Sequence, residues 1–415
     1  MPRLRFPEFQ NEPAFQWREL GELIYEKRSR NRELRYGKED VLSVSGDYGC
    51  VNQIELLGRS YAGVSVKDYH IVETGDVVYT KSPLKKSPYG IIKENKGKPG
   101  IVSTLYAVYS PTAICHAAYL DHYFSVEYNI NSYLQPLVNK GAKNDMKVKN
   151  SDVIKGGIFV PGLKEQKKIA DFLSSIDTLI AAQVEKIDAL KIYKKWLMQK
   201  LFPGEGETVP QLRFPEFRDS EEWKIKALGD VCNILQGYGF PNEMQGRYDG
   251  EYPFCKVSDV SKAVAVNGGL LNEAANYVDS EDVLNLRAKL IPVGSTVFAK
   301  IGEALRLNRR AYVNRECLID NNVVGLKAND DTSNDYFIYL SSQLIDLNKH
   351  CGGAVPSVKK STLETVEIAL PDPFEQQKIA EFLSSLDGAI AAHTEKLEAL
   401  KVHKKGLMQK IFPQP

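Results

Sequence analysis

The side chains best suited to chemistry in this sequence are basic, and they gather in two stretches. The first runs from Lys81 to Tyr89 and the second from Lys300 to Arg310. Each follows a short run of strand-forming residues that begins at a turn with glycine, so both should lie on loops at the end of a strand. Lysine and arginine suit phosphates and guanine edges, and serine hydroxyls suit phosphates. The residues expected to contact nucleic acid are Lys81, Ser82, Lys85, Lys86, Tyr89, Lys300, Arg306, Arg309 and Arg310. A run of charge is also typical of a solvated face, and this alternative stays open.

The motifs of common catalytic and nucleotide-binding sites do not occur in the sequence. There is no G-x-x-x-x-G-K-[ST] phosphate loop and no G-x-G-x-x-G fingerprint. The N-P-P-[YF] or D-P-P-[YF] segment of an amino-methyltransferase is also missing. His116 and His122 make too small a group to indicate a metal site. We therefore expect no catalytic residue, no bound metal and no cofactor in this chain.

The composition is that of an ordinary soluble protein. The 415 residues are 43% hydrophobic and 26% charged, which is enough for two or three domains with cores of their own. No apolar run reaches the length of a membrane span, and the first residues lack the apolar core of a signal peptide, so a cytoplasmic location is expected. The six cysteines never occur as C-x-x-C and are read as reduced, mostly buried thiols. Because the net charge is only +1, any nucleic-acid surface must be a local basic patch.

The elements that must position these residues are organised around a helix that occurs twice, at residues 165–203 and 375–413. At a constant offset of 210, 26 of the 39 positions are identical. Apolar residues recur at alternating steps of four and three, which is typical of a coiled-coil seam. We expect the two helices to pair antiparallel within the chain, although two separate amphipathic helices remain the alternative. The pairing residues are Ile176, Ile180, Ile187, Leu190, Leu386, Ile390, Leu397 and Leu400.

Polar residues interrupt this seam at matching places in the two copies. Gln183 corresponds to His393, and Lys194 corresponds to Lys404. Buried polar groups at such positions commonly fix the register of a coiled coil.

The repeat extends beyond the helices. The segment LRFPEF occurs at residues 4–9 and again at 212–217, so the chain consists of two tandem modules. The predicted fold class is α+β, with two mixed α/β domains that are each followed by a long helix. The expected boundaries are 1–160 and 210–370 for the domains, 161–209 for the first helix with its linker, and 371–415 for the second helix. The LRFPEF segment and the long helix repeat, whereas the domains between them differ in sequence. We therefore expect two different targets to be recognised at a fixed separation.

With these repeats in place, the chain resembles the DNA-specificity subunit of type I restriction–modification systems. The similarity rests on P-x-x-x-E-Q-x-K-I-A-x-F-L at residues 161–173 and 371–383, and on the strand that ends in lysine in each module. Residues 353–356 and 252–260 match further parts of the pattern, whereas residues 141–145 lack the proline of their counterpart. The resemblance covers essentially the whole chain.

The resemblance implies that this chain recognises DNA and that partner subunits carry out catalysis. Each target-recognition domain is expected to read one half of a bipartite double-stranded DNA sequence, and the helices are expected to set the spacer. They would also dock two copies of an adenine-N6 methyltransferase subunit that carries S-adenosylmethionine, and a motor-nuclease subunit would use ATP. The candidate contacts for the methyltransferase are Phe172, Phe382, Lys195, Lys405, Met198 and Met408. The alternative for the phenylalanines and methionines is that they pack under their own recognition domains.

Two other functions are compatible with the residues alone. The first is a free-standing DNA-binding regulator that dimerises through its helices. The second is a scaffold that binds peptides or other ligands through its two modules.

Overall fold

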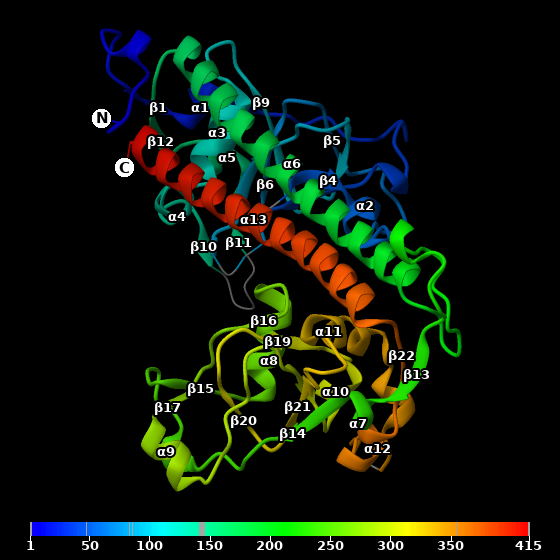
Figure 1. The fold of residues 1–415 in the computed structure, drawn as a ribbon. Helices are drawn as coiled ribbons and strands as arrows, with labels where there is room; N and C mark the ends of the chain where they lie inside the picture. Colours follow the sequence, from blue (N-terminus) through cyan, green and yellow to red (C-terminus); the bar gives the residue numbers. More distant parts are fainter. Residues whose placement is uncertain are drawn as a thin grey trace. The chain divides into compact units, whose positions relative to one another are not determined.

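The computed structural model describes residues 2–46, 48–82, 84, 86–140, 146–353 and 355–413. The chain forms two compact units, of which the first contains residues 1–182 and 397–415 and the second contains residues 183–396. Two long helices, α6 (Leu163–Leu201) and α13 (Pro373–Ile411), pass through both units (Figure 1). The division between the units falls within the helices, because the end of each helix packs with the globular part beside it.

The first unit contains twelve named strands and five short helices within the described residues, besides parts of the long ones. The strands are β1 (Gln16–Glu19), β2 (Ile24–Glu26), β3 (Leu42–Ser45), β4 (Gly49–Asn52), β5 (His70–Val72), β6 (Val77–Thr80), β7 (Ile91–Glu94), β8 (Gly100–Val102), β9 (Tyr106–Pro111), β10 (Asn139–Lys140), β11 (Met146–Lys147) and β12 (Gly157–Val160). The helices are α1 (Leu20–Leu23), α2 (Gln53–Leu57), α3 (Ala117–Phe124), α4 (Glu127–Leu134) and α5 (Asn150–Val153).

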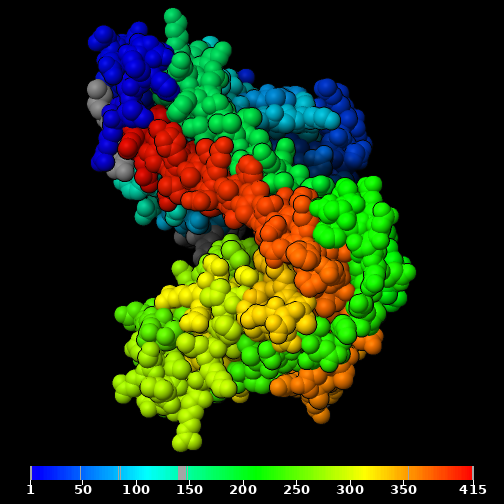
Figure 2. Space-filling model, viewed as in Figure 1, coloured from blue at the N-terminus to red at the C-terminus, as the bar shows by residue number. Residues whose placement is uncertain are grey.

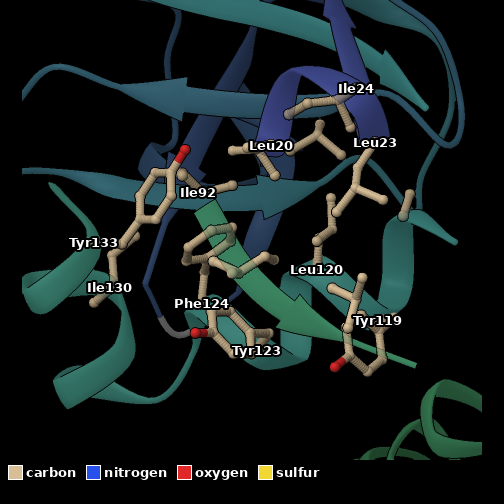
Figure 3. Packing of buried hydrophobic residues seen from close by; sticks show 14 of the residues in the cluster. Leu20, Leu23, Ile24, Ile92, Tyr119, Leu120, Tyr123, Phe124, Ile130 and Tyr133 are labelled. Atoms are coloured by element: carbon tan, nitrogen blue, oxygen red, sulfur yellow. The ribbon is translucent and has the colours of Figure 1, made fainter. Parts of the chain in front are cut away.

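A four-stranded antiparallel sheet with the order β2-β9-β6-β7 forms the centre of the first unit. All four residues of β6 are buried, which fits its place between two neighbours. Figure 3 shows part of the core, in which Ile92 lies near the aromatic side chains of α3 and α4. The same core includes Leu173 of α6 and Phe412 after α13, so the helices are part of the domain and not an appendage to it.

The second unit contains ten named strands within the described residues. They are β13 (Lys224–Ala227), β14 (Cys232–Gln236), β15 (Tyr252–Cys255), β16 (Leu270–Leu271), β17 (Tyr277–Val278), β18 (Thr296–Ala299), β19 (Ala311–Val313), β20 (Leu318–Ile319), β21 (Val323–Ala328) and β22 (Glu367–Leu370). The short helices are α7 (Leu228–Val231), α8 (Val257–Val266), α9 (Ser280–Asn285), α10 (Glu303–Arg306), α11 (Asp335–Leu344) and α12 (Lys360–Glu364).

The two units repeat one topology. The main sheet of the second unit has the order β14-β21-β18-β19-β16, which matches the first sheet strand by strand and adds β16. In both units a strand near the start pairs antiparallel with the strand that precedes a long helix, namely β1 with β12 and β13 with β22. The predicted α+β class with two tandem mixed domains is confirmed, and the duplication includes parts whose sequences have diverged.

The coiled-coil seam is confirmed by burial. None of the eight predicted pairing residues is exposed: Ile176, Ile187 and Leu397 are buried, and the others are half-buried. Within the second unit Gln183 Nε2 lies 2.7 Å from His393 Nδ1, and Lys194 Nζ lies 2.6 Å from Asp387 Oδ2. The residue numbers rise on one helix as they fall on the other, so the helices are antiparallel. In the first unit Lys404 forms the corresponding ion pair with Asp177.

The LRFPEF segments contact the C-terminal ends of the long helices. In the second unit the Leu212 N–H donates to the carbonyl of Lys200 at 2.8 Å. In the first unit the N–H groups of Arg3 and Leu4 donate to the carbonyl of Lys410 at 2.8 and 3.0 Å. Figure 2 shows these first residues in blue against the red end of α13. Since the last carbonyls of a helix lack partners within it, both segments act as caps.

Among the described residues, no helix is long and apolar enough to cross a membrane. The same part of the chain holds no group of three or more His, Cys, Asp or Glu side chains suited to a metal ion.

Candidate nucleic-acid interface

Lys81 and Lys300 occupy equivalent positions at the ends of central strands. Lys81 follows β6, which lies between β9 and β7, and Lys300 follows β18, which lies between β21 and β19. The turn before each strand contains a glycine with positive φ, +88° at Gly75 and +91° at Gly294, where a side chain would be strained. The predicted pattern of glycine turn, strand and lysine is therefore confirmed in both modules.

Lys81 lies beside a buried histidine that also approaches the loop after β2. His70 is 3% exposed, and its backbone forms an isolated bridge with Arg30. Burial lowers the pKa of His70 to about 4, and the charges of Arg30 and Lys81 act in the same direction. Burial also lowers the pKa of Lys81, which Glu26 opposes. His70 is thus neutral near pH 7.

The rest of the first predicted stretch divides into exposed and structural residues. Ser82 and Lys86 are exposed, and the carbonyl of Lys86 accepts a hydrogen bond from Asn131 Nδ2 at 3.0 Å, which ties the loop to α4. Tyr89 packs against the first core, and its carbonyl accepts from Tyr79 Oη at 2.8 Å. Lys85 lies outside the described residues. The loop therefore presents Ser82 and Lys86, while Tyr89 helps to shape it.

In the second module the predicted residues differ in exposure. Lys300 is half-buried, and its Nζ donates to Gln236 Oε1 at 2.9 Å, so the lysine is joined to the end of β14. Arg306 on α10 is exposed and lies 3.7 Å from Glu303, a weak pair at the surface. Arg309 is half-buried. Lys300 and Arg306 remain candidates for DNA contact.

Arg310 requires a correction. Its side chain is only 3% exposed and lies over Phe298, with Cζ 4.6 Å from the ring centroid. Its Nη2 donates to Asn308 Oδ1 at 3.2 Å and to the carbonyl of Ile345 at 3.1 Å. Burial lowers the pKa of the guanidinium to about 10. Because a side chain buried in this way has little surface for a ligand, we replace the expected direct contact by a role in shaping the loop.

Sequence reasoning missed a third basic stretch, residues 27–38, which we name the arginine loop. Six of its twelve residues are Lys or Arg, and it follows β2 directly. Arg28, Arg32, Arg35 and Lys38 are exposed. The density of basic residues was a visible signal in the sequence, but the position of the loop at the edge of the main sheet depends on the pairing of β2 with β9, which no local pattern reveals.

The corresponding loop of the second module, residues 237–248, has a different character. Tyr238 and Phe240 pack in a small core around Phe254, with the rings of Phe240 and Phe254 stacked at 4.0 Å. The loop's one basic residue, Arg247, is paired with Asp279 and Asp282. The same place in the two modules thus carries free cations in one and packed aromatic rings in the other.

Residues 220–402 match the protein family described as "Type I restriction modification DNA specificity domain". The matched stretch covers most of the second module. The resemblance to type I specificity subunits stated from the sequence is thereby confirmed, and the first module shares the sheet order of the second.

A curated relative supports the same family. The chain is 28% identical over 308 residues to the putative type I restriction enzyme MjaX specificity subunit of Methanocaldococcus jannaschii. The matched stretch covers 71% of this chain and 66% of that protein, so the chain spans about two thirds of its relative.

Two solved structures share the fold. The S subunit of the type I restriction–modification system from M. genitalium aligns over 100% of both chains with a TM-score of 0.61 and 12% identity. A chain from a structural study of complex assembly and conformational transition in the type I R-M system gives a TM-score of 0.54 at 17% identity. That alignment covers 96% of this chain and 98% of the other.

The structure explains the E-Q-x-K-I-A-x-F motif at the start of each long helix of the specificity fold. Glu165 accepts two hydrogen bonds from Arg5, at 2.8 and 2.7 Å, and Glu375 accepts two from Arg213 at the same distances. The pKa of each arginine is raised, chiefly by the hydrogen bond to its glutamate. The motif therefore fastens the LRFPEF segment to the helix.

The following glutamine of the motif fastens the helix to its domain. Gln166 Oε1 accepts from the His116 N–H at 3.0 Å, just before α3, and its Nε2 donates to the carbonyl of Pro161 at 2.9 Å. Gln376 repeats both bonds, with the N–H of Asn334 before α11 and the carbonyl of Pro371.

The residues expected to contact a methyltransferase have mixed positions. Met198 and Met408 are buried in the second and first cores, so both are corrected to core residues. Phe172 meets Phe6 edge to face at 5.5 Å, and Phe382 meets Phe214 at 5.6 Å. The remaining expected contacts, Lys195 and Lys405, are exposed.

Proposed function

We propose that this chain is the subunit that selects the DNA sequence for a type I restriction–modification complex. Each specificity module reads one half of a bipartite target in double-stranded DNA, and the helix pair sets the spacer between the halves. The observation that carries this proposal is the repeated frame with different loops. Lys81 and Lys300 end equivalent strands, yet the loops beside them are an arginine-rich segment in one module and a packed aromatic segment in the other.

The physical argument begins with the rigidity of that frame. Each loop is held at the end of a sheet whose central strand is fully buried, so changes in loop sequence leave the scaffold intact. Base edges in the major groove differ in their donors and acceptors, and loop side chains suit such reading. Two unlike sets of loops therefore read two unlike half-sites.

We further propose that catalysis belongs to partner subunits. Two copies of an adenine-N6 methyltransferase subunit, each with S-adenosylmethionine, would dock on the helix pair, and a motor-nuclease subunit would use ATP. The support is the sequence, which lacks the motifs for these reactions, together with the similarity to a chain from a type I complex. With a net charge of +1, the chain would share phosphate neutralisation with these partners.

Methylome mapping tests the proposal. Cells that express this chain with the methyltransferase subunit of its own system are expected to show a new bipartite motif with N6-methyladenine in both halves. Cells that express the methyltransferase alone serve as the control and should lack that motif. A soluble, assembled complex that adds no new motif to the genome would overturn the proposed function.

The alternative of a free-standing regulator gains no support from the relatives described above. The mass of the protein in solution distinguishes it from the present proposal. A regulator that dimerises through its helices would have the mass of two chains in solution without any methyltransferase. The present proposal expects the helices to pair within one chain, and hence the mass of a single chain.

A further inference from the structure

We propose that the arginine loop, residues 27–38, binds the phosphate backbone of DNA and gives the two modules unequal electrostatic shares in binding. This inference rests on the proposed function, and it assigns a contact that the sequence patterns did not single out. It concerns affinity and not the choice of bases.

The charges of the loop divide into structural and free ones. Lys27 is paired with the buried Asp76 at 2.7 Å, and Arg30 donates to the carbonyl of Asp68 at 2.6 Å. Across the described part of the chain, no carboxylate lies within ion-pair distance of Arg32, Arg35 or Lys38. Three cations are therefore left to meet an external anion.

A second segment adds to the same surface. Tyr36, Ala62 and Tyr69 pack together around Val66, so residues 59–69 lie against the arginine loop. This segment brings Arg59, whose Cζ lies 4.6 Å from the centroid of the Tyr61 ring, and the exposed Lys67. In Figure 1 this region is the blue part around the labels β4, α2 and β5. Cations on two neighbouring segments fit the repeated charge of a nucleic-acid backbone.

The loop is held in a fixed shape by one buried amide. Asn31 is 1% exposed; its Nδ2 donates to the carbonyl of Tyr36 at 2.8 Å, and its Oδ1 accepts from the Tyr36 N–H at 3.1 Å. Leu34, at the tip, has φ of +54°, an unusual conformation that this closure maintains. Arg32 and Arg35 thus stand on a loop ordered before DNA arrives, which reduces the entropy cost of binding.

The corresponding loop of the second module, residues 237–248, offers no equivalent. It carries Arg247 as its one cation, and two aspartates pair with it. Arg306 lies on another element, α10, and has an acidic neighbour in Glu303. The first module therefore carries the larger share of counterion release, and salt weakens its contact more.

The test is a titration of duplex DNA that carries the mapped target, with the full chain and its methyltransferase subunits, across a series of KCl concentrations. Each phosphate contact contributes about 0.9 to the slope of log K against log salt. The variant Arg32→Ala/Arg35→Ala is expected to reduce the slope by about 2 and to weaken target and non-target DNA equally. The control Lys224→Ala/Lys226→Ala removes the same charge from exposed lysines on β13 and should leave the slope unchanged.

The other outcomes are distinct. A wild-type complex without sequence-selective binding refutes the proposed function itself. Selective wild-type binding with an unchanged slope in the arginine variant refutes only this inference. If the variant loses selectivity for target over non-target DNA while its salt slope is unchanged, these arginines contact bases. If the variant no longer assembles with the methyltransferase subunits, the loop is a protein contact. Each of these results overturns the phosphate assignment.

Asn31 is the positioning residue of this surface, and its test keeps the charge constant. Asn31→Ala is expected to weaken DNA binding in the wild-type background and to have no further effect on binding when Arg32 and Arg35 are already alanine. A general loss of folding would instead weaken binding in both backgrounds, so this double-mutant comparison separates the two explanations.

Discussion

At the scale of residues, the two repeated motifs of each module bind each other, since the arginine of LRFPEF pairs with the glutamate that begins E-Q-x-K-I-A. Arg213, whose side chain is 9% exposed, meets the buried Glu375, and the neighbouring Lys378 meets Glu216 at 3.1 Å at the surface. The sequence showed that both segments repeat, but it did not show that they bind one another, because partners 162 residues apart leave no local pattern. The prediction that Arg310 contacts DNA failed for a similar reason. Its burial is determined by strands and helices that are distant in the sequence.

Glu375→Ala should destabilise the second unit by about 3–5 kcal/mol, because it leaves the Arg213 guanidinium buried without its carboxylate. The matched control Lys378→Ala breaks the exposed pair of the same helix turn and should cost about 0–1 kcal/mol. Hydrogen exchange of residues 212–217 under native conditions measures both. Equal protection in the two variants would contradict the assignment of the fastening to the buried pair.

At the scale of elements, the long helices were predictable and the sheets were not. A seam with steps of four and three determines which side of a helix is buried, so the extent and the pairing face of each helix followed from the sequence, whereas the antiparallel direction was expected from the chain folding back. Of the polar seam positions, Gln183 contacts its counterpart His393, but Lys194 and Lys404 pair with Asp387 and Asp177 and not with each other. Strand order depends on pairing between distant segments, so the place of the arginine loop after β2, at the edge of the main sheet, did not follow from any local pattern.

Ile187→Asp should disrupt the helix pair, because it places an unpaired charge at a seam position that is 5% exposed. We expect a loss of about 3 kcal/mol or more in the unfolding free energy of the second unit. Ala189→Asp introduces the same side chain on the exposed side of the same helix and should cost about 1 kcal/mol or less. Urea denaturation compares the two. Similar losses would show that this seam position does not hold the helices together.

At the scale of the whole molecule, the proposed function depends on two unlike surfaces carried by one repeated scaffold. The frame is maintained by buried contacts that occur in both copies, and the loops differ without disturbing them. This separation explains why the family and fold could be recognised from the sequence while the bases to be read could not. Readout depends on side-chain positions in loops, and those follow no periodic pattern.

Seven residues inserted into each long helix, between Gln183 and Ile187 and between His393 and Leu397, should lengthen the recognised spacer. A heptad adds about 10.5 Å of helix, which corresponds to as much as about three base pairs. The control places seven residues in the exposed segment 204–207 and should leave the spacer unchanged. Methylome mapping of both variants gives the result, and an unchanged spacer after the helix insertion would show that the helix pair does not set the spacer.

The caps on the two long helices have a consequence for the order of segments along the polypeptide. Lys200 and Lys410 offer the same carbonyl to the two LRFPEF segments. Leu212 follows Lys200 closely in the sequence, whereas Leu4 and Lys410 are far apart in it. The same contact therefore forms between neighbouring and distant segments of the chain, so it does not depend on how they are connected. A permuted chain, opened within residues 204–209 and closed by a linker between 413 and 2, would preserve every contact described here.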